Sequence, residues 1–128
     1  MIDWNRRYVY DTESYPNAWT CGVVHCGSGT RWIFEASDRM NTLPQFCDLM
    51  RGISESGSKM IGFNNEHYDY PMIHPIIACD GNTDAARIYE KNQAIFSAGF
   101  NDWSHNIWAR DRFVPQIDLF KIMHFDNL

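Results

Sequence analysis

The chain has 128 residues, 45% hydrophobic and 15% aromatic, which predicts a single domain, residues 1–128, with a sizeable core and excludes a disordered chain. No apolar run approaches the roughly 20 residues of a membrane span, and the start lacks the apolar segment of a signal peptide, so we expect a cytoplasmic protein without a membrane partner. The net charge of −5 gives no overall basic footprint, so any nucleic-acid function must come from a local site.

Three β-prone segments open the chain. Residues 7–10 and 18–26 are rich in β-branched and aromatic side chains, and residues 31–35 follow a Gly-Ser-Gly turn. Three consecutive strands with a tight second connection predict an antiparallel meander. Gly22 can mark a bulge within the second strand.

The next predicted element is a helix that Thr42 caps and that ends near residues 56–57. Its apolar positions fit one buried face and are Leu43, Phe46, Met50 and Ile53. Residues 59–63 form a short apolar run, which predicts a buried fourth strand.

A second helix is predicted from Tyr68, with Asp69 at the N-terminal end of the face that points toward the sheet. Pro75 lacks an N–H group and crowds the preceding turn, so we expect the helix to kink or restart there.

The remaining elements are a third helix, a loop and a last strand. The helix follows the cap residues 82–84 and ends near Gly99, and residues 99–112 form the loop. Residues 114–120 hold a short strand, and Pro115 favours its start or a sheet edge. This order predicts an α/β domain in which helices pack on a mixed sheet.

The cysteines and histidines show no metal-binding pattern. No C-x-x-C pair occurs, and Cys47 and Cys79 lie in apolar segments, so we expect reduced, buried thiols rather than disulfides or zinc ligands. The five histidines form neither an H-x₃₋₅-H nor an H-E-x-x-H site.

Two acids follow the first predicted strand. Asp11 and Glu13 lie two residues apart, so in extended geometry both side chains point to one face. Carboxylates this close repel one another, and a cation such as Mg²⁺ or Mn²⁺ removes that repulsion. Taken alone, the pair is weak evidence for a metal site, because solvated acids at strand ends are commoner.

A second segment resembles a known nuclease motif. Gly-Phe-Asn at 62–64 leads through Tyr68 to Asp-Tyr-Pro at 69–71, about sixty residues after Asp11 and Glu13. Together these residues resemble the first two motifs of the DEDD 3′-to-5′ exonucleases. The resemblance is closest to the proofreading domains of family B DNA polymerases and to related phage exonucleases. It implies a ribonuclease-H-like fold and phosphodiester hydrolysis with two Mg²⁺ or Mn²⁺ ions.

The resemblance also implies a role for each matching residue. Asp11 would bridge the two metals, Glu13 would bind the ion that activates water, and Asp69 would support the second ion, partly through water. Asn64 would contact the strand end that is cleaved, and Tyr68 would pack beneath the site. The substrate would be a single-stranded DNA 3′ end or a primer end.

Each of these residues also has a purely structural interpretation. Asn64 and Asn65 can simply form the turn into the helix, and Asp69 can stabilise the helix N-terminus. Tyr68 and Phe63 are more typical of core aromatics than of residues that stack on substrate.

Residues of the later loop are open to two interpretations as well. Trp103, Trp108 and Phe113 can stack on bases or pack within the protein. Arg110 and Arg112 can bind phosphate or remain solvated.

The third motif of the resemblance is absent. Residues 117–119 match the segment that precedes it, but a Tyr or His followed about four residues later by Asp does not occur. His124 and Asp126 are only two apart, so we do not assign them the missing roles. Without the motif helix, apolar surface near the first strand should be exposed.

Three functions follow from these patterns. The first is an exonuclease domain whose site is incomplete in this chain and is completed by another polypeptide or by self-association. The second is a catalytically deficient module of the same fold, of phage origin for example, that binds nucleic acid or a protein partner. The third is an unrelated α/β domain. We therefore expect the isolated chain to be weak or inactive as an enzyme.

Overall fold

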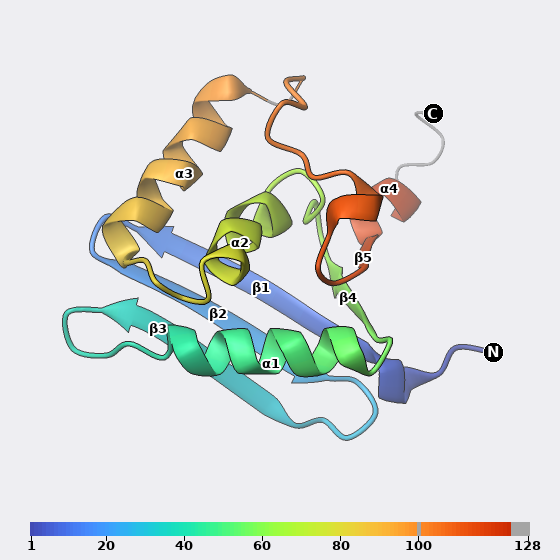
Figure 1. The fold of residues 1–128 in the computed structure, drawn as a ribbon. Helices are drawn as coiled ribbons and strands as arrows, with labels where there is room; N and C mark the ends of the chain where they lie inside the picture. The colour runs from blue at the N-terminus through green and yellow to red at the C-terminus, as the bar shows by residue number, and fades with distance from the viewer. Residues whose placement is uncertain (100, 124–128) are drawn as a thin grey trace.

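The computed structural model describes residues 1–99 and 101–123, which form one five-stranded sheet covered by helices (Figure 1). The strands are β1 (Arg7–Tyr15), β2 (Ala18–His25), β3 (Arg31–Ser37), β4 (Lys59–Gly62) and β5 (Gln116–Asp118). The α-helices are α1 (Leu43–Glu55), α2 (Asp69–Ala78), α3 (Ala85–Ala98) and α4 (Leu119–Met123), and short 3₁₀ turns are η1 (Trp4–Arg6) and η2 (Ala109–Asp111).

The sheet is mixed, with the order β3-β2-β1-β4-β5. The first three strands form the predicted antiparallel meander, and β4 and β5 continue the sheet in parallel beyond β1. The predicted element order and the α/β class are therefore confirmed. As Pro115 indicated, β5 lies at an edge, where the Pro115 carbonyl accepts a hydrogen bond from Met60.

The central strand β1 is longer than the predicted segment 7–10. It pairs with β2 as far as Tyr15, whereas its pairing with β4 ends at Val9. Asp11 and Glu13 therefore lie within the strand, in a stretch that has β2 on one side and no strand on the other among the described residues. Gly22 pairs in continuous register on both sides, so the predicted bulge is wrong.

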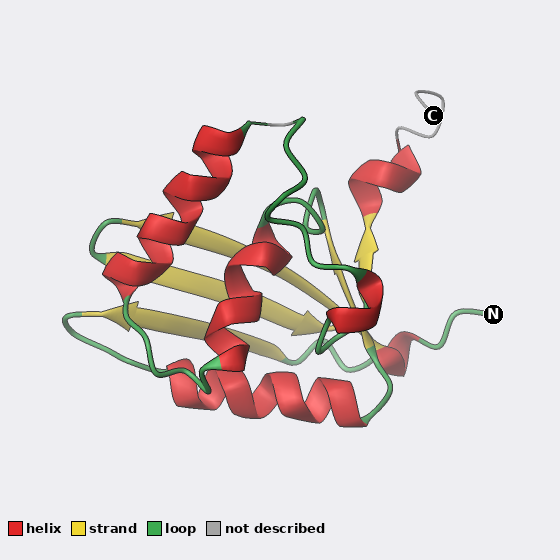
Figure 2. Ribbon diagram, turned by 45° about the horizontal axis from the view of Figure 1, so that its top comes forward, coloured by secondary structure: helices red, strands yellow, loops and turns green. Residues whose placement is uncertain are grey.

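The two faces of the sheet differ in what covers them. Figures 1 and 2 show α1, α2 and α3 on one side of the sheet, which we call the covered face. Its inward side chains include Tyr10, Trp19 and Phe34, all buried in the core. We call the opposite side, which carries Val9, Asp11, Glu13 and Ile33, the open face, because all four residues are exposed. The predicted apolar surface beside β1 is thus present.

Two local predictions for the helices hold only in part, since Thr42 is the N-cap residue of α1 as predicted, and α2 shows no restart at Pro75. The Thr42 side chain does not cap α1, because its hydroxyl accepts a hydrogen bond from the Glu35 N–H at 2.8 Å, while the Asn41 side chain accepts from Leu43. Helix α2 runs through Pro75 to Ala78 without a restart. Its first turns are almost fully buried, so tertiary packing offsets the hydrogen bond that proline removes.

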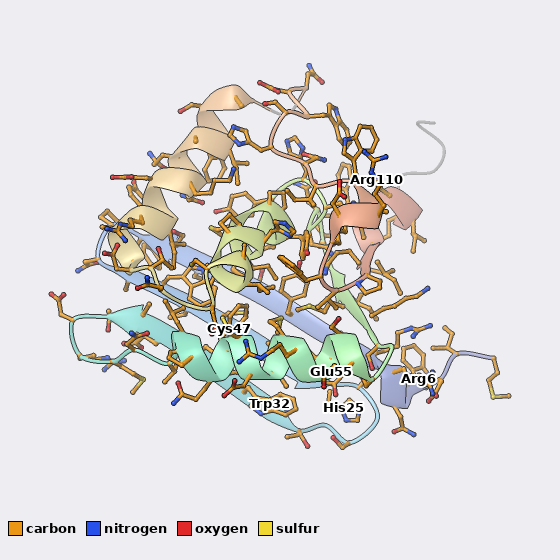
Figure 3. The ribbon with its side chains drawn as sticks, in the orientation of Figure 1. Arg6, His25, Trp32, Cys47, Glu55 and Arg110 are labelled. Carbon is orange, nitrogen blue, oxygen red and sulfur yellow. The ribbon has the colours of Figure 1, made fainter. Side chains whose placement is uncertain are left out.

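The four cysteines are free, as expected, but they are not all buried. Cys47, labelled in Figure 3, lies on α1 with its Sγ 3.7 Å from the Ile76 carbonyl of α2. Burial raises the pKa of the Cys47 thiol to about 11. Cys79 is exposed after the end of α2, contrary to the prediction. Within the described residues, no helix has the length and apolar character needed to span a membrane.

Candidate active site

The loop between β4 and α2 is held in a tight conformation. A Cβ added at Gly62 would lie 2.8 Å from two carbon atoms of the Asn65 side chain, so only glycine allows this approach. Asn64 has a positive φ of 57°, a conformation that Asn tolerates better than most residues. The Asn65 carbonyl accepts from the Tyr70 N–H at 2.8 Å, which leads the chain into α2. The Asn residues therefore do form the turn that the structural interpretation predicted.

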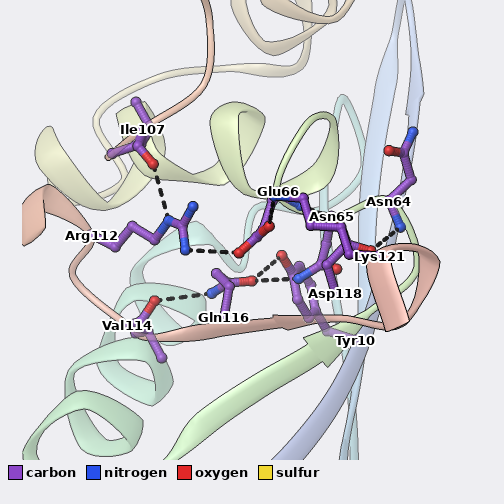
Figure 4. Close-up of polar contacts among 10 residues, drawn as sticks. All are labelled: Tyr10, Asn64, Asn65, Glu66, Ile107, Arg112, Val114, Gln116, Asp118 and Lys121. Carbon is purple, nitrogen blue, oxygen red and sulfur yellow. Dashed lines mark hydrogen bonds and ion pairs between the residues drawn. The ribbon is translucent and has the colours of Figure 1, made fainter. Parts of the chain in front are cut away.

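Asp118 at the end of β5 fixes this loop from the other side. Its buried carboxylate accepts hydrogen bonds from the backbone N–H groups of Asn64 at 2.7 Å, Glu66 at 3.2 Å and Phe120 at 3.0 Å. Figure 4 shows the Asn64 side chain pointing away from this group of contacts. Asp118 thus positions the loop backbone and leaves the Asn64 amide free to face the surface.

Two further residues, Gln116 and Glu66, make polar contacts that support the same loop (Figure 4). The Gln116 side-chain oxygen accepts from the Tyr10 hydroxyl at 2.7 Å and from the Asn65 amide at 2.9 Å. Glu66 forms ion pairs with Arg112 at 3.1 Å and with Lys121. The loop is therefore tied to β1, β5 and the segment before β5 by groups that are mostly shielded from water, which strengthens such contacts.

Asp69 is the first residue of α2 and its carboxylate is buried on the covered face. Only 5% of the residue is exposed, and the carboxylate accepts a hydrogen bond from the Thr12 hydroxyl of β1. Burial, together with the nearby charge of Asp11, raises the pKa of Asp69 to about 6, although the hydrogen bond from Thr12 opposes this shift. The predicted position at the sheet-facing helix start is confirmed.

Asp11 and Glu13 share one face of β1, as their spacing predicted, and that face is the open one. The intervening Thr12 points the other way, toward Asp69. The acids therefore flank Thr12 on the face of β1 opposite to Asp69, in a stretch that β4 does not pair with. Among residues 1–99 and 101–123, no three His, Cys, Asp or Glu side chains are already grouped as ligands of one metal ion.

Tyr68 directly precedes Asp69 at the start of α2. Burial raises the pKa of its hydroxyl to about 12, and the negative charges of Asp69, Glu13 and Asp11 add to the shift. The hydroxyl donates to the Asn92 side chain of α3. Tyr68 also packs partly against the core, as the structural interpretation predicted.

Phe63 was predicted to be a core aromatic, but its side chain is exposed. It is 54% exposed and contacts Phe120 edge-to-face, with ring centroids 5.5 Å apart. Arg112 is not solvated either, because its guanidinium is largely buried and donates to the Ile107 carbonyl and to Glu66. Arg110 is exposed, as a solvated loop arginine would be. His124 and Asp126 lie outside the described residues.

A hollow of about 330 Å³ lies beside the loop and α3. Its lining residues are Asn64, His67, Tyr68, Ile95, Phe96 and Gly99. Asn64 and Tyr68, the two residues predicted to contact substrate or support the site, both belong to it. The exposed Phe96 ring, tilted against Tyr68 with centroids 5.1 Å apart, adds an apolar wall that the sequence did not assign.

Comparison of the chain with family models, with curated proteins and with solved structures finds no match. The motif residues and the geometry described above are therefore the basis for a functional proposal. Sequence reasoning missed Thr12 and Asp118 as residues that position the site. The period of two along a strand could have placed Thr12 opposite its acidic neighbours, but no local pattern indicates that Asp118 caps a loop 54 residues away in sequence.

Proposed function

We propose that the chain is a ribonuclease-H-like DEDD exonuclease domain that removes nucleotides from a DNA 3′ end with two Mg²⁺ or Mn²⁺ ions. A three-strand meander followed by alternating helices and parallel strands is the arrangement that the resemblance implied. The main support is the buried Asp69 carboxylate held against β1 by Thr12, with Asp11 and Glu13 on either side of that threonine.

The donor set suits such ions. Asp11, Glu13 and Asp69 offer hard oxygen atoms, which Mg²⁺ and Mn²⁺ prefer. Burial raises the pKa of Asp69 to about 6, so ionisation of this carboxylate is costly, and a divalent cation would offset that cost. Asp11 and Glu13 are exposed and can bind ions from solvent with little rearrangement.

When bound, the ions would polarise the phosphate, activate the attacking water and neutralise the leaving 3′ oxygen. The chain's own residues would position the strand end. The Asn64 amide would donate to or accept from the terminal nucleotide, and the hollow bounded by Tyr68 and Phe96 would receive its apolar surface. Asp118 would keep the Asn64 backbone fixed during this contact.

The open face favours a second candidate, a catalytically deficient module of the same fold that binds a partner. Val9 is 43% exposed and Ile33 80% exposed on a sheet face that no described helix covers. A second polypeptide or another copy of the chain could cover this surface. A partner that adds a carboxylate beside Asp11 and Glu13 would complete the metal site, which joins this candidate to the first.

A nuclease assay tests the proposal. The chain would be incubated with a 5′-labelled single-stranded DNA and Mn²⁺, and the products separated by length. We expect shortening from the 3′ end, at a low rate if a completing partner is required. Asp11→Asn, Glu13→Gln and Asp69→Asn should each lower the rate about a hundredfold or more, the scale of losing a group that stabilises transition-state charge.

Glu55→Gln is the matched control, because Glu55 is an exposed acid at the far end of α1 (Figure 3). It should leave the rate unchanged. Equal absence of cleavage by the wild-type chain and Asp11→Asn, with DNA binding retained, would favour the deficient module. Cleavage that survives all three substitutions would contradict both the site and the mechanism.

A further inference from the structure

A second, larger hollow of about 530 Å³ lies on the other side of the loop that leads into α2. Six of its lining residues are Glu66, Trp103, Ile107, Trp108, Arg112 and Lys121. We call it the indole pocket, after its two tryptophans. Both indoles are largely exposed, Trp108 by 74%, although two such rings could bury a large apolar area if they packed inside the protein. They are therefore available to stack on a ligand.

The ionisable groups that line the pocket are predominantly cationic. Arg112 and Lys121 both pair with the single carboxylate Glu66, so the three groups together carry one net positive charge. Arg112 and Glu66 form a largely buried ion pair. Lys121 is half-exposed, with its ammonium 5.4 Å from the Trp103 ring centroid. The exposed Arg110, labelled in Figure 3, lies on the adjacent η2 turn, where it pairs with the exposed Asp111 at 3.5 Å. Flat aromatic surface next to exposed cations fits a base and its phosphate.

The indole pocket adjoins the first hollow. His67 lines the first hollow and its ring packs on Trp103 with centroids 5.3 Å apart, while Trp103 lines the indole pocket. A strand whose end lies beside Asn64 and Tyr68 can therefore continue past the His67–Trp103 pair into the second hollow.

We propose that the indole pocket binds a nucleotide of single-stranded nucleic acid on the 5′ side of the end held at Asn64. The base stacks on Trp108 and Trp103, and the phosphate lies near Lys121. Which end of the strand is held rests on the proposed exonuclease function, but stacking in the pocket requires no metal ion.

Fluorescence anisotropy of a labelled oligothymidylate, measured without divalent ions, tests this site directly. Trp108→Ala should raise Kd by about tenfold, the scale of one lost base–aromatic stack. Trp108→Phe should recover most of the affinity, because it keeps an aromatic face. Lys121→Gln should reduce the slope of log Kd against log salt by about one, as expected for one lost phosphate contact.

Trp4→Ala is the matched control, because Trp4 is 53% exposed on η1 and lies outside the lining of either hollow. Its Kd should equal that of the wild type. Equal affinity of Trp108→Ala, Trp4→Ala and wild type would overturn the proposal, as would a wild-type chain that binds no oligothymidylate. Circular dichroism spectra would show that the variants are folded.

Asp11→Asn separates this inference from the proposed function. It should lose any cleavage and keep the wild-type Kd, because it leaves the indole pocket intact. Affinity that depends on Trp108 in a chain without nuclease activity would support the pocket and count against the exonuclease. Cleavage by a chain whose affinity does not depend on Trp108 would support the exonuclease and count against the pocket.

Discussion

The two faces of the sheet place adjacent residues of one strand in opposite environments. On β1, Thr12 is buried and holds Asp69, while Asp11 and Glu13 on either side of it are exposed. On β3, Phe34 is buried and Ile33 is exposed. The covered face therefore supplies stability and positions Asp69, and the open face presents acids and apolar side chains to solvent. The proposed site depends on both faces, and it lies where β1, among the described residues, has no neighbouring strand on the β4 side.

The largest predicted difference between the faces concerns Phe34 and Ile33. Phe34 packs edge-to-face on Phe46 with centroids 5.4 Å apart, so Phe34→Ala should lower the free energy of unfolding by about 3–5 kcal/mol. Ile33→Ala should change it by less than about 0.5 kcal/mol. Urea denaturation of the two variants measures both values. A large loss for Ile33→Ala would mean that the open face is covered in solution.

Asp69 and Asp11 give the next contrast. The pKa of Asp69 is raised from 3.8 to about 6, so the native state binds this proton more strongly than the unfolded chain does. Stability from this group is highest below about pH 4 and falls as the pH rises to about 6. Asp69→Asn should therefore be more stable than wild type at pH 7, by up to about 3 kcal/mol, and the difference should vanish near pH 4.

Asp11→Asn is the control for that measurement, because the exposed side chain should affect stability by less than about 0.5 kcal/mol. Thermal unfolding at several pH values between 4 and 7 provides the comparison. A stability difference between Asp69→Asn and wild type that does not change with pH would contradict the buried, ionisable Asp69.

Gly62 and Gly22 give a third comparison, between a packed loop position and an open sheet position. Gly62→Ala places a Cβ against Asn65 and should cost about 2 kcal/mol, because the packed loop must shift. At Gly22, paired with Asp11 on the open face, an added Cβ meets nothing within 4 Å. Gly22→Ala should be neutral or slightly stabilising, by up to about 1 kcal/mol. Equal losses in the two variants, measured by denaturant unfolding, would contradict this difference.

More of the fold than of the candidate site could be predicted from the sequence. Apolar periodicity predicted α1, β-prone runs with turn residues predicted the meander, and Pro115 predicted the edge strand, because these depend on local sequence. The extension of β1 to Tyr15 was missed because Asp11 and Glu13 are polar, and pairing with β2 outweighs their low strand propensity. The roles of Asp118 and Gln116 could not be predicted, since their contacts with the loop before α2 span more than fifty residues.

Carboxylates from both faces hold the same divalent ions in the proposed site. Titration of Mn²⁺ into the wild-type chain and into the Asp11→Asn and Asp69→Asn variants, followed by electron paramagnetic resonance of the free ion, tests this arrangement most directly. We expect each substitution to weaken binding by tenfold or more, although Asp11 lies on the open face and Asp69 on the covered face. Binding that neither substitution changes would contradict this arrangement.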